Sequence, residues 1–101
     1  VYIANHAEDR VLFYDRAFAT IIDRLKPQFA TIEHYVEFDG PGWETLLAPH
    51  GGDYAWIEGD ERDPCMLCYT SGTTGNPKGV LYEHRSTMIH AMTEVAPTVF
   101  N

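Results

Sequence analysis

The most constraining feature of this chain is a segment rich in Gly, Ser and Thr at residues 69–80, which lies between two short apolar runs. Its chemistry-bearing residues are the glycines Gly72, Gly75 and Gly79, the hydroxyl residues Thr70, Ser71, Thr73 and Thr74, and Lys78. Glycines let a backbone approach an anion closely, so that successive N–H groups converge on phosphate oxygens. Hydroxyls add neutral donors, and lysine adds a compact positive charge. The segment therefore predicts a phosphate-binding loop, and the flanking apolar runs argue against a flexible linker.

The spacing around the lysine excludes the two commonest nucleotide loops. Gly-x-x-x-x-Gly-Lys-Ser/Thr requires a glycine before the lysine and a hydroxyl after it, whereas Pro77 precedes Lys78 and Gly79 follows. Gly-x-Gly-x-x-Gly fails because residue 74 is threonine. A different class of phosphate loop is indicated.

Apolar periodicity predicts the elements around this loop. Strands are expected at residues 11–14, 34–38, 65–69 and 80–82, and helices at residues 1–6, 15–26, 43–48 and 84–96. Asp15 is expected to cap the second helix and Pro27 to end it, and Pro97 is expected to end the last helix. The alternation of strands and helices predicts an α/β fold, a parallel sheet with flanking helices, in one small domain or part of a larger one.

Charge and hydropathy exclude several classes of partner. The formal net charge is −8, which argues against binding to nucleic acid or to an anionic membrane surface. No apolar run approaches the length of a membrane span.

Three other groups of residues are interpreted as structural rather than functional. Cys65 and Cys68 are expected to be two buried free thiols rather than a redox or zinc pair, since residues three apart on a strand point to opposite faces. Free thiols suit a reducing compartment and indicate the cytoplasm. The acidic stretch at residues 53–63 lacks a calcium-loop pattern and is interpreted as a solvated loop, so no metal site is predicted. His84 is expected to orient the helix that it begins rather than to bind phosphate.

Residues 67–80 resemble the AMP-binding signature of the superfamily of acyl-CoA synthetases, nonribosomal-peptide adenylation domains and luciferases. Residues 2–10 are similar to a segment that precedes a flavodoxin-like strand in these enzymes. Residues 81–87, with 90–92, resemble the medium- and long-chain fatty-acyl-CoA ligases. The resemblance covers nearly all of residues 1–101 but only a middle portion of the family's large N-terminal domain, so a partial flavodoxin-like fold is implied.

The resemblance implies a two-step reaction of ATP, a carboxylic (fatty) acid and coenzyme A, with Mg²⁺. The carboxylate attacks the α-phosphate to give acyl-AMP and pyrophosphate, and coenzyme A then displaces AMP. The residues expected to hold the leaving pyrophosphate are Thr70, Ser71, Gly72, Thr73, Thr74, Gly75 and Lys78. The glutamate that would hold Mg²⁺ and the catalytic lysine of the family are not found here, so the catalytic residues are unknown and the 101-residue chain is expected to be inactive alone.

Two other hypotheses remain open. The chain could be a nucleotide-binding module without chemistry, or an inert structural remnant of such an enzyme. In either case, exposed sheet edges would allow self-association.

Overall fold

The structure is a computed structural model that describes residues 1–95, and it divides into two compact units, Val1–Ala55 and Trp56–Asn101. The expected helix end at Ala96 and Pro97 lies outside the described residues. No helix of residues 1–95 is long and apolar enough to cross a bilayer.

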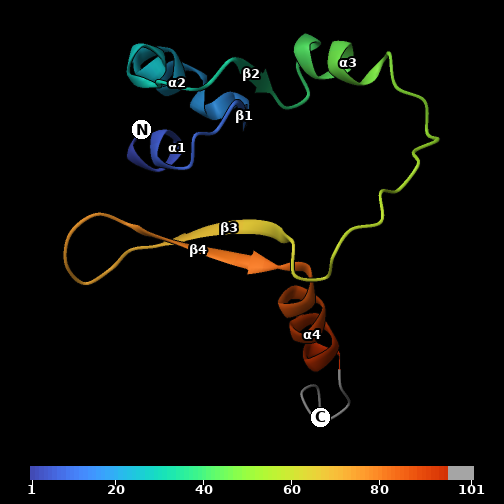
Figure 1. Cartoon of the computed structure of the whole chain (residues 1–101). Helices are drawn as coiled ribbons and strands as arrows, with labels where there is room; N and C mark the ends of the chain where they lie inside the picture. The colour runs from blue at the N-terminus through green and yellow to red at the C-terminus, as the bar shows by residue number, and fades with distance from the viewer. Residues whose placement is uncertain (96–101) are drawn as a thin grey trace. The chain divides into compact units, whose positions relative to one another are not determined.

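The first unit starts with the predicted alternation of helices and strands (Figure 1). Its elements are α1 (Tyr2–His6), β1 (Val11–Tyr14), the 3₁₀ turn η1 (Arg16–Phe18), α2 (Ala19–Leu25), the 3₁₀ turn η2 (Lys26–Gln28), β2 (His34–Glu37) and α3 (Pro41–Leu47). β1 and β2 pair in parallel, with Val11 opposite His34 and Tyr14 opposite Glu37. A parallel pair needs a long crossover, which α2 supplies, and this part of the predicted parallel sheet is confirmed.

Local signals fix where these helices begin and end. The Asp15 carboxylate accepts a hydrogen bond from the Ala17 N–H at 2.8 Å, so the predicted cap is confirmed at the start of η1. α2 ends at Leu25, and Pro27 lies in the 3₁₀ turn that follows. α3 begins at Pro41, earlier than predicted, because proline suits the first helical turn.

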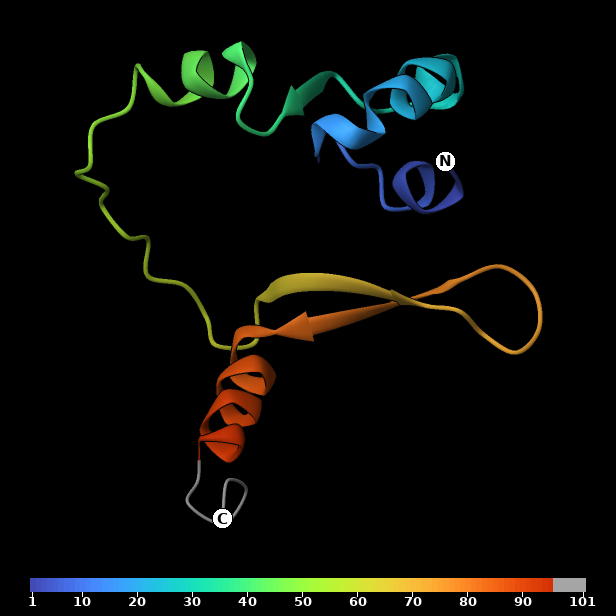
Figure 2. The ribbon, with the colours of Figure 1, turned by 180° about the vertical axis from the view of Figure 1, so that it is seen from behind.

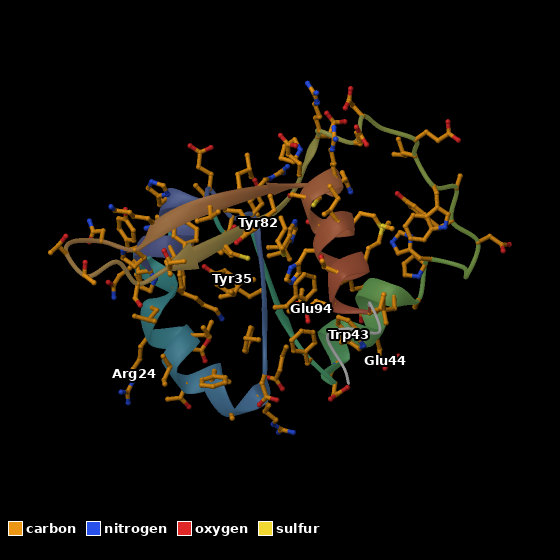
Figure 3. The ribbon with its side chains drawn as sticks, turned by 90° about the horizontal axis from the view of Figure 1, so that it is seen from below. Arg24, Tyr35, Trp43, Glu44, Tyr82 and Glu94 are labelled. Atoms are coloured by element: carbon orange, nitrogen blue, oxygen red, sulfur yellow. The ribbon has the colours of Figure 1, made fainter. Side chains whose placement is uncertain are left out.

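A small aromatic cluster joins the strands to α3. The ring of Phe38 lies 5.3 Å from that of Trp43 and 5.9 Å from that of Phe13, measured between centroids. Trp43 comes from α3 and is labelled in Figure 3. Ala4 and Val36 are the buried apolar residues of the described part of the chain, with 9% and 7% exposure. The packing is thin, so polar contacts matter for the stability of this unit.

Asn5 links α1 to the segment that follows α2. Its Nδ2 donates to the Gln28 carbonyl at 2.9 Å, and its Oδ1 accepts from the Ala30 N–H at 2.8 Å. Both ends of one half-buried amide are therefore satisfied by main chain more than twenty residues away.

Replacing Asn5 with alanine should lower the free energy of unfolding by about 1–3 kcal/mol, because two hydrogen bonds are lost together. Urea unfolding of both variants measures the change. Gln28→Ala is the matched control. Only the main-chain carbonyl of Gln28 accepts a hydrogen bond from Asn5, so this substitution should change the free energy of unfolding by no more than about 0.5 kcal/mol. Equal effects of the two substitutions would contradict the role of Asn5.

Arg10 and Glu33 form a bidentate ion pair beside the start of β2. Arg10 Nε donates to Glu33 Oε1 at 3.1 Å, and Nη2 donates to Oε2 at 2.9 Å. The hydrogen bonds, and then the attraction of the guanidinium, hold the pKa of Glu33 below its ordinary value of 4.5. A carboxylate with a lowered folded-state pKa stabilises the fold above its ordinary pKa and loses that contribution as the pH falls through the lowered value.

Glu33→Gln should therefore make the stability of the protein less steeply dependent on pH in the acid range. Urea midpoints between about pH 6 and about pH 3 measure that slope. Glu58→Gln serves as control, since Glu58 forms no ion pair among residues 1–95. If the stability of both variants depended equally steeply on pH in this range, the ion pair would not be the source of the pH dependence.

The second unit is a β-hairpin followed by a helix. β3 (Pro64–Thr70) pairs with β4 (Lys78–Glu83), and α4 (His84–Glu94) follows directly. The pairing is antiparallel, so the prediction of parallel strands throughout was wrong for this part. The connection, residues 71–77, is too short for the crossover that parallel strands need. The fold is thus mixed α/β, with one small parallel and one small antiparallel sheet.

The two cysteines on β3 are free, as predicted, but neither is buried, so the prediction of buried thiols was wrong. Cys65 is exposed and Cys68 is half-buried. The strand register breaks between Pro64 and Met66, which places Cys65 at an irregular position. There its Sγ lies 3.5 Å from the Tyr82 carbonyl oxygen and 3.4 Å from Thr87 Oγ1. A bulge changes where a side chain points, which the sequence pattern does not reveal.

Candidate functional site

The predicted phosphate-binding residues lie at the turn of the β3–β4 hairpin. Residues 71–77, hereafter the hairpin loop, lie at the end of the hairpin opposite α4 (Figures 1 and 2). Thr70 is the last residue of β3 and Lys78 is the first residue of β4, and the two stand directly opposite each other. Strand pairing therefore fixes both ends of the loop, as the flanking apolar runs had indicated.

Gly75 and Gly72 differ in conformation and surroundings within the hairpin loop. Gly75 has a φ of +84°, a conformation that a residue with a side chain adopts only with strain. A Cβ at Gly72 would lie 4.0 Å from Cε of Lys78 and 3.6 Å from the Thr74 carbonyl oxygen. The stem of Lys78 therefore passes beside the start of the loop, and three of the predicted site residues are neighbours.

The polar groups of the site are open to solvent and available to a ligand. Lys78 and the hydroxyl residues of the site are exposed, whereas Pro77 is half-buried. Lys78 forms no ion pair with any of residues 1–95, unlike Arg10, Arg16, Lys26 and Arg85. The hydroxyl groups of the site also donate no hydrogen bond to any of residues 1–95. These hydroxyl groups belong to Thr70, Ser71, Thr73 and Thr74. Such a set of uncommitted donors around one ammonium can hold a polyphosphate.

An acidic turn anchors the other end of the hairpin. The main-chain carbonyls of Asp63 and Glu61 accept from the first two N–H groups of α4, those of His84 at 3.2 Å and Arg85 at 2.8 Å. Arg85 Nη1 also lies 3.2 Å from Glu61 Oε1. Helix α4 leaves these N–H groups without partners of its own, so the turn caps the helix and ties it to β3.

Residues of two sequence interpretations, His84 and the acidic stretch, lie in or beside this turn. His84 does begin the helix, and its main chain rather than its ring makes the capping contact. The side chains of Asp60 and Asp63 accept from main-chain N–H groups within the turn, at 2.8 and 3.1 Å. Among residues 1–95, no three His, Cys, Asp or Glu side chains come together in a way that could hold a metal ion.

Sequence reasoning missed a cavity between the hairpin and α4. It has a volume of about 330 Å³ and is lined by Met66, Cys68, Tyr82, Ser86, Thr87 and His90. Tyr82, labelled in Figure 3, comes from β4. The signal was present in the sequence: Met66 and Cys68 alternate onto one face of a strand, and Ser86 and His90 share one face of a helix. The hairpin loop contributes no residue to this cavity.

Comparison with known proteins assigns the chain to a family. The whole chain, residues 1–101, matches the family of AMP-binding enzymes. It is 43% identical to the 3-methylmercaptopropionyl-CoA ligase of Ruegeria pomeroyi, over 90% of the chain and 19% of that protein. It is 40% identical to the medium-chain-fatty-acid–CoA ligase of Ectopseudomonas oleovorans, over 99% of the chain and 20% of that protein.

A solved structure with the same fold is that of the anthranilate CoA ligase AuaEII in complex with anthranoyl-AMP. The match has a TM-score of 0.81 at 28% identity and covers 90% of this chain and 19% of that one. The chain thus spans about a fifth of the length of the relatives that it matches. With a family match over its full length and these levels of identity, the chain belongs to the AMP-binding enzyme family and is related to the acyl-CoA ligases that form AMP.

Proposed function

We propose that this chain supplies the loop that holds the ATP phosphates in an AMP-forming acyl-CoA ligase. The observation that carries the proposal is the hairpin loop itself. Lys78, without an ion pair among residues 1–95, stands at its base beside hydroxyl and main-chain donors, in a chain of the AMP-binding enzyme family. On this proposal the chain is part of the N-terminal domain of the ligase.

In the first step of the proposed reaction, a carboxylate oxygen of the acid attacks the α-phosphorus of ATP. The bond from that phosphorus to the oxygen bridging the α- and β-phosphates breaks, and pyrophosphate leaves with the bonding electrons. Negative charge builds on the leaving group, so donors placed around the β- and γ-phosphates stabilise the transition state more than the ground state. In the second step the coenzyme A thiolate attacks the acyl carbon and AMP leaves.

The residues of the loop have distinct parts in this step. The glycines, Gly72 and Gly75, let main-chain N–H groups face the phosphates, and Lys78 supplies the positive charge. Thr70, Ser71, Thr73 and Thr74 supply neutral hydroxyl donors. Mg²⁺ accompanies ATP in such reactions, and the contribution proposed for this chain consists of amides, hydroxyls and one ammonium.

The acyl group is proposed to be a fatty acid of medium or long chain. The relatives act on acids as different as 3-methylmercaptopropionate and medium-chain fatty acids, while AuaEII binds anthranoyl-AMP. A loop that touches only the phosphates suits all of them, since the phosphates are the part of the reaction that they share.

The two free cysteines suit a reducing compartment, and we propose on that ground that the protein is cytoplasmic.

Lys78→Ala should slow acid-dependent exchange of labelled pyrophosphate into ATP about 100-fold, since one preorganised donor to developing charge is removed. The assay uses the protein expressed from its complete coding sequence, with octanoate as the acid. Lys26→Ala is the matched control, because Lys26 is paired with Asp23 at 2.7 Å on α2, outside the loop.

Exchange that is unchanged in Lys78→Ala would remove this residue from its assigned role. Saturable binding of ATP without acid-dependent exchange in the unsubstituted protein would favour a nucleotide-binding module without chemistry. Exchange with 3-methylmercaptopropionate but not octanoate would retain the reaction and replace the proposed acyl group.

A further inference from the structure

Gly79 lies against the ring of Tyr69, in a contact so tight that an added Cβ would make its neighbours shift by a few tenths of an ångström. The two residues stand opposite each other across the hairpin. A Cβ built on Gly79 would lie 3.3 Å from Cζ and 3.5 Å from Cε1 of Tyr69, and 3.2 Å from Cδ1 of Leu67. Carbon atoms in ordinary contact keep about 3.5–4.0 Å apart, so a methyl group at this position would push the ring away.

Gly79 is not required here for its backbone conformation. In the described part of the chain, the glycine with positive φ is Gly75, so Gly79 has a backbone conformation that any residue could adopt. A glycine inside a strand weakens the strand unless something approaches it closely. The close approach of the aromatic ring supplies that reason, since an aromatic residue placed across a strand glycine restores the lost packing.

This pair lies one step inside the pair that closes the loop. Tyr69 precedes Thr70, and Gly79 follows Lys78, so the two cross-strand pairs are adjacent rungs of one ladder. A separation of the strands at the Tyr69–Gly79 rung would move the main chain on both sides of the turn. Thr70 and Lys78 are the two site residues held by strand pairing, and they would move with it.

We propose that Gly79 is a positioning residue: by admitting the ring of Tyr69, it fixes the closing pair Thr70 and Lys78 in place for the phosphates of ATP. The inference rests on the function proposed for the loop. Gly79 touches no substrate in this account and acts through Tyr69 on its neighbours.

The test is steady-state exchange kinetics on the protein expressed from its complete coding sequence, with ATP and octanoate varied separately. Gly79→Ala should raise the KM for ATP at least about fivefold through overpacking against the ring, and leave the KM for octanoate within about twofold. A purely structural loss would instead lower the amount of active protein, reducing kcat with both KM values unchanged.

A double substitution tests whether the effect passes through the ring. Tyr69→Leu should itself raise the KM for ATP, and adding Gly79→Ala to it should change that KM by less than about twofold, because the added methyl group then meets only flexible aliphatic side chains such as Leu67. If Gly79→Ala does not fold, Tyr69→Leu alone carries the test, with the raised KM for ATP as the expected result. Leu81→Ala, in the same strand and 62% exposed, controls for general weakening of the hairpin and should leave both KM values unchanged.

The outcomes separate the two proposals. Wild-type protein without acid-dependent exchange overturns the proposed function and the inference with it. Wild-type exchange together with an unchanged KM for ATP in Gly79→Ala and Tyr69→Leu overturns the positioning role alone. Equal and independent effects of the two substitutions would show that Gly79 does not act through Tyr69.

Discussion

The antiparallel pairing of β3 with β4 is the constraint on which the candidate site depends. A segment rich in glycine and hydroxyl residues has many conformations in a free chain and loses much entropy when it is ordered. Here both of its ends, Thr70 and Lys78, are held opposite each other by main-chain hydrogen bonds of a ladder. The ladder restricts the loop before any ligand arrives, and a restricted loop pays less of the ordering cost when it binds.

The far end of the hairpin is held by a different kind of contact. Carbonyl groups of the turn that precedes β3 cap α4, which follows β4 without an intervening loop. The two strands are thus joined at one end by the loop and at the other by a helix cap. With little buried apolar surface in the described part of the chain, these directed polar contacts define the geometry more than the packing does.

The sequence predicted most of the elements because their signals are local. Asp15 could cap a helix, Pro27 could end one, and Gly72 and Gly75 could suit a loop, whereas Gly79 lies in β4. The direction of pairing between β3 and β4 depends on the length of their connection. Residues 71–77 are too few for a parallel crossover, but the prediction of a uniform α/β sheet did not take this length into account. The exposure of Cys65 could not be predicted, because a bulge arises only from three-dimensional packing. The cavity beside α4 was missed, although its lining residues share one face of a strand and one face of a helix.

The site itself was predicted as a set of residue types, and the structure adds their order in space. Composition indicates donors and charge but does not tell which residues face each other across the turn. The glycine beneath the ring of Tyr69 also has a consequence for strand register. A slip of β4 by one residue would bring either Lys78 or Val80 opposite Tyr69, and the ring would then lose its close approach to a glycine. The Tyr69–Gly79 contact thus distinguishes the observed register from its two neighbours, and the length of the loop follows from that register.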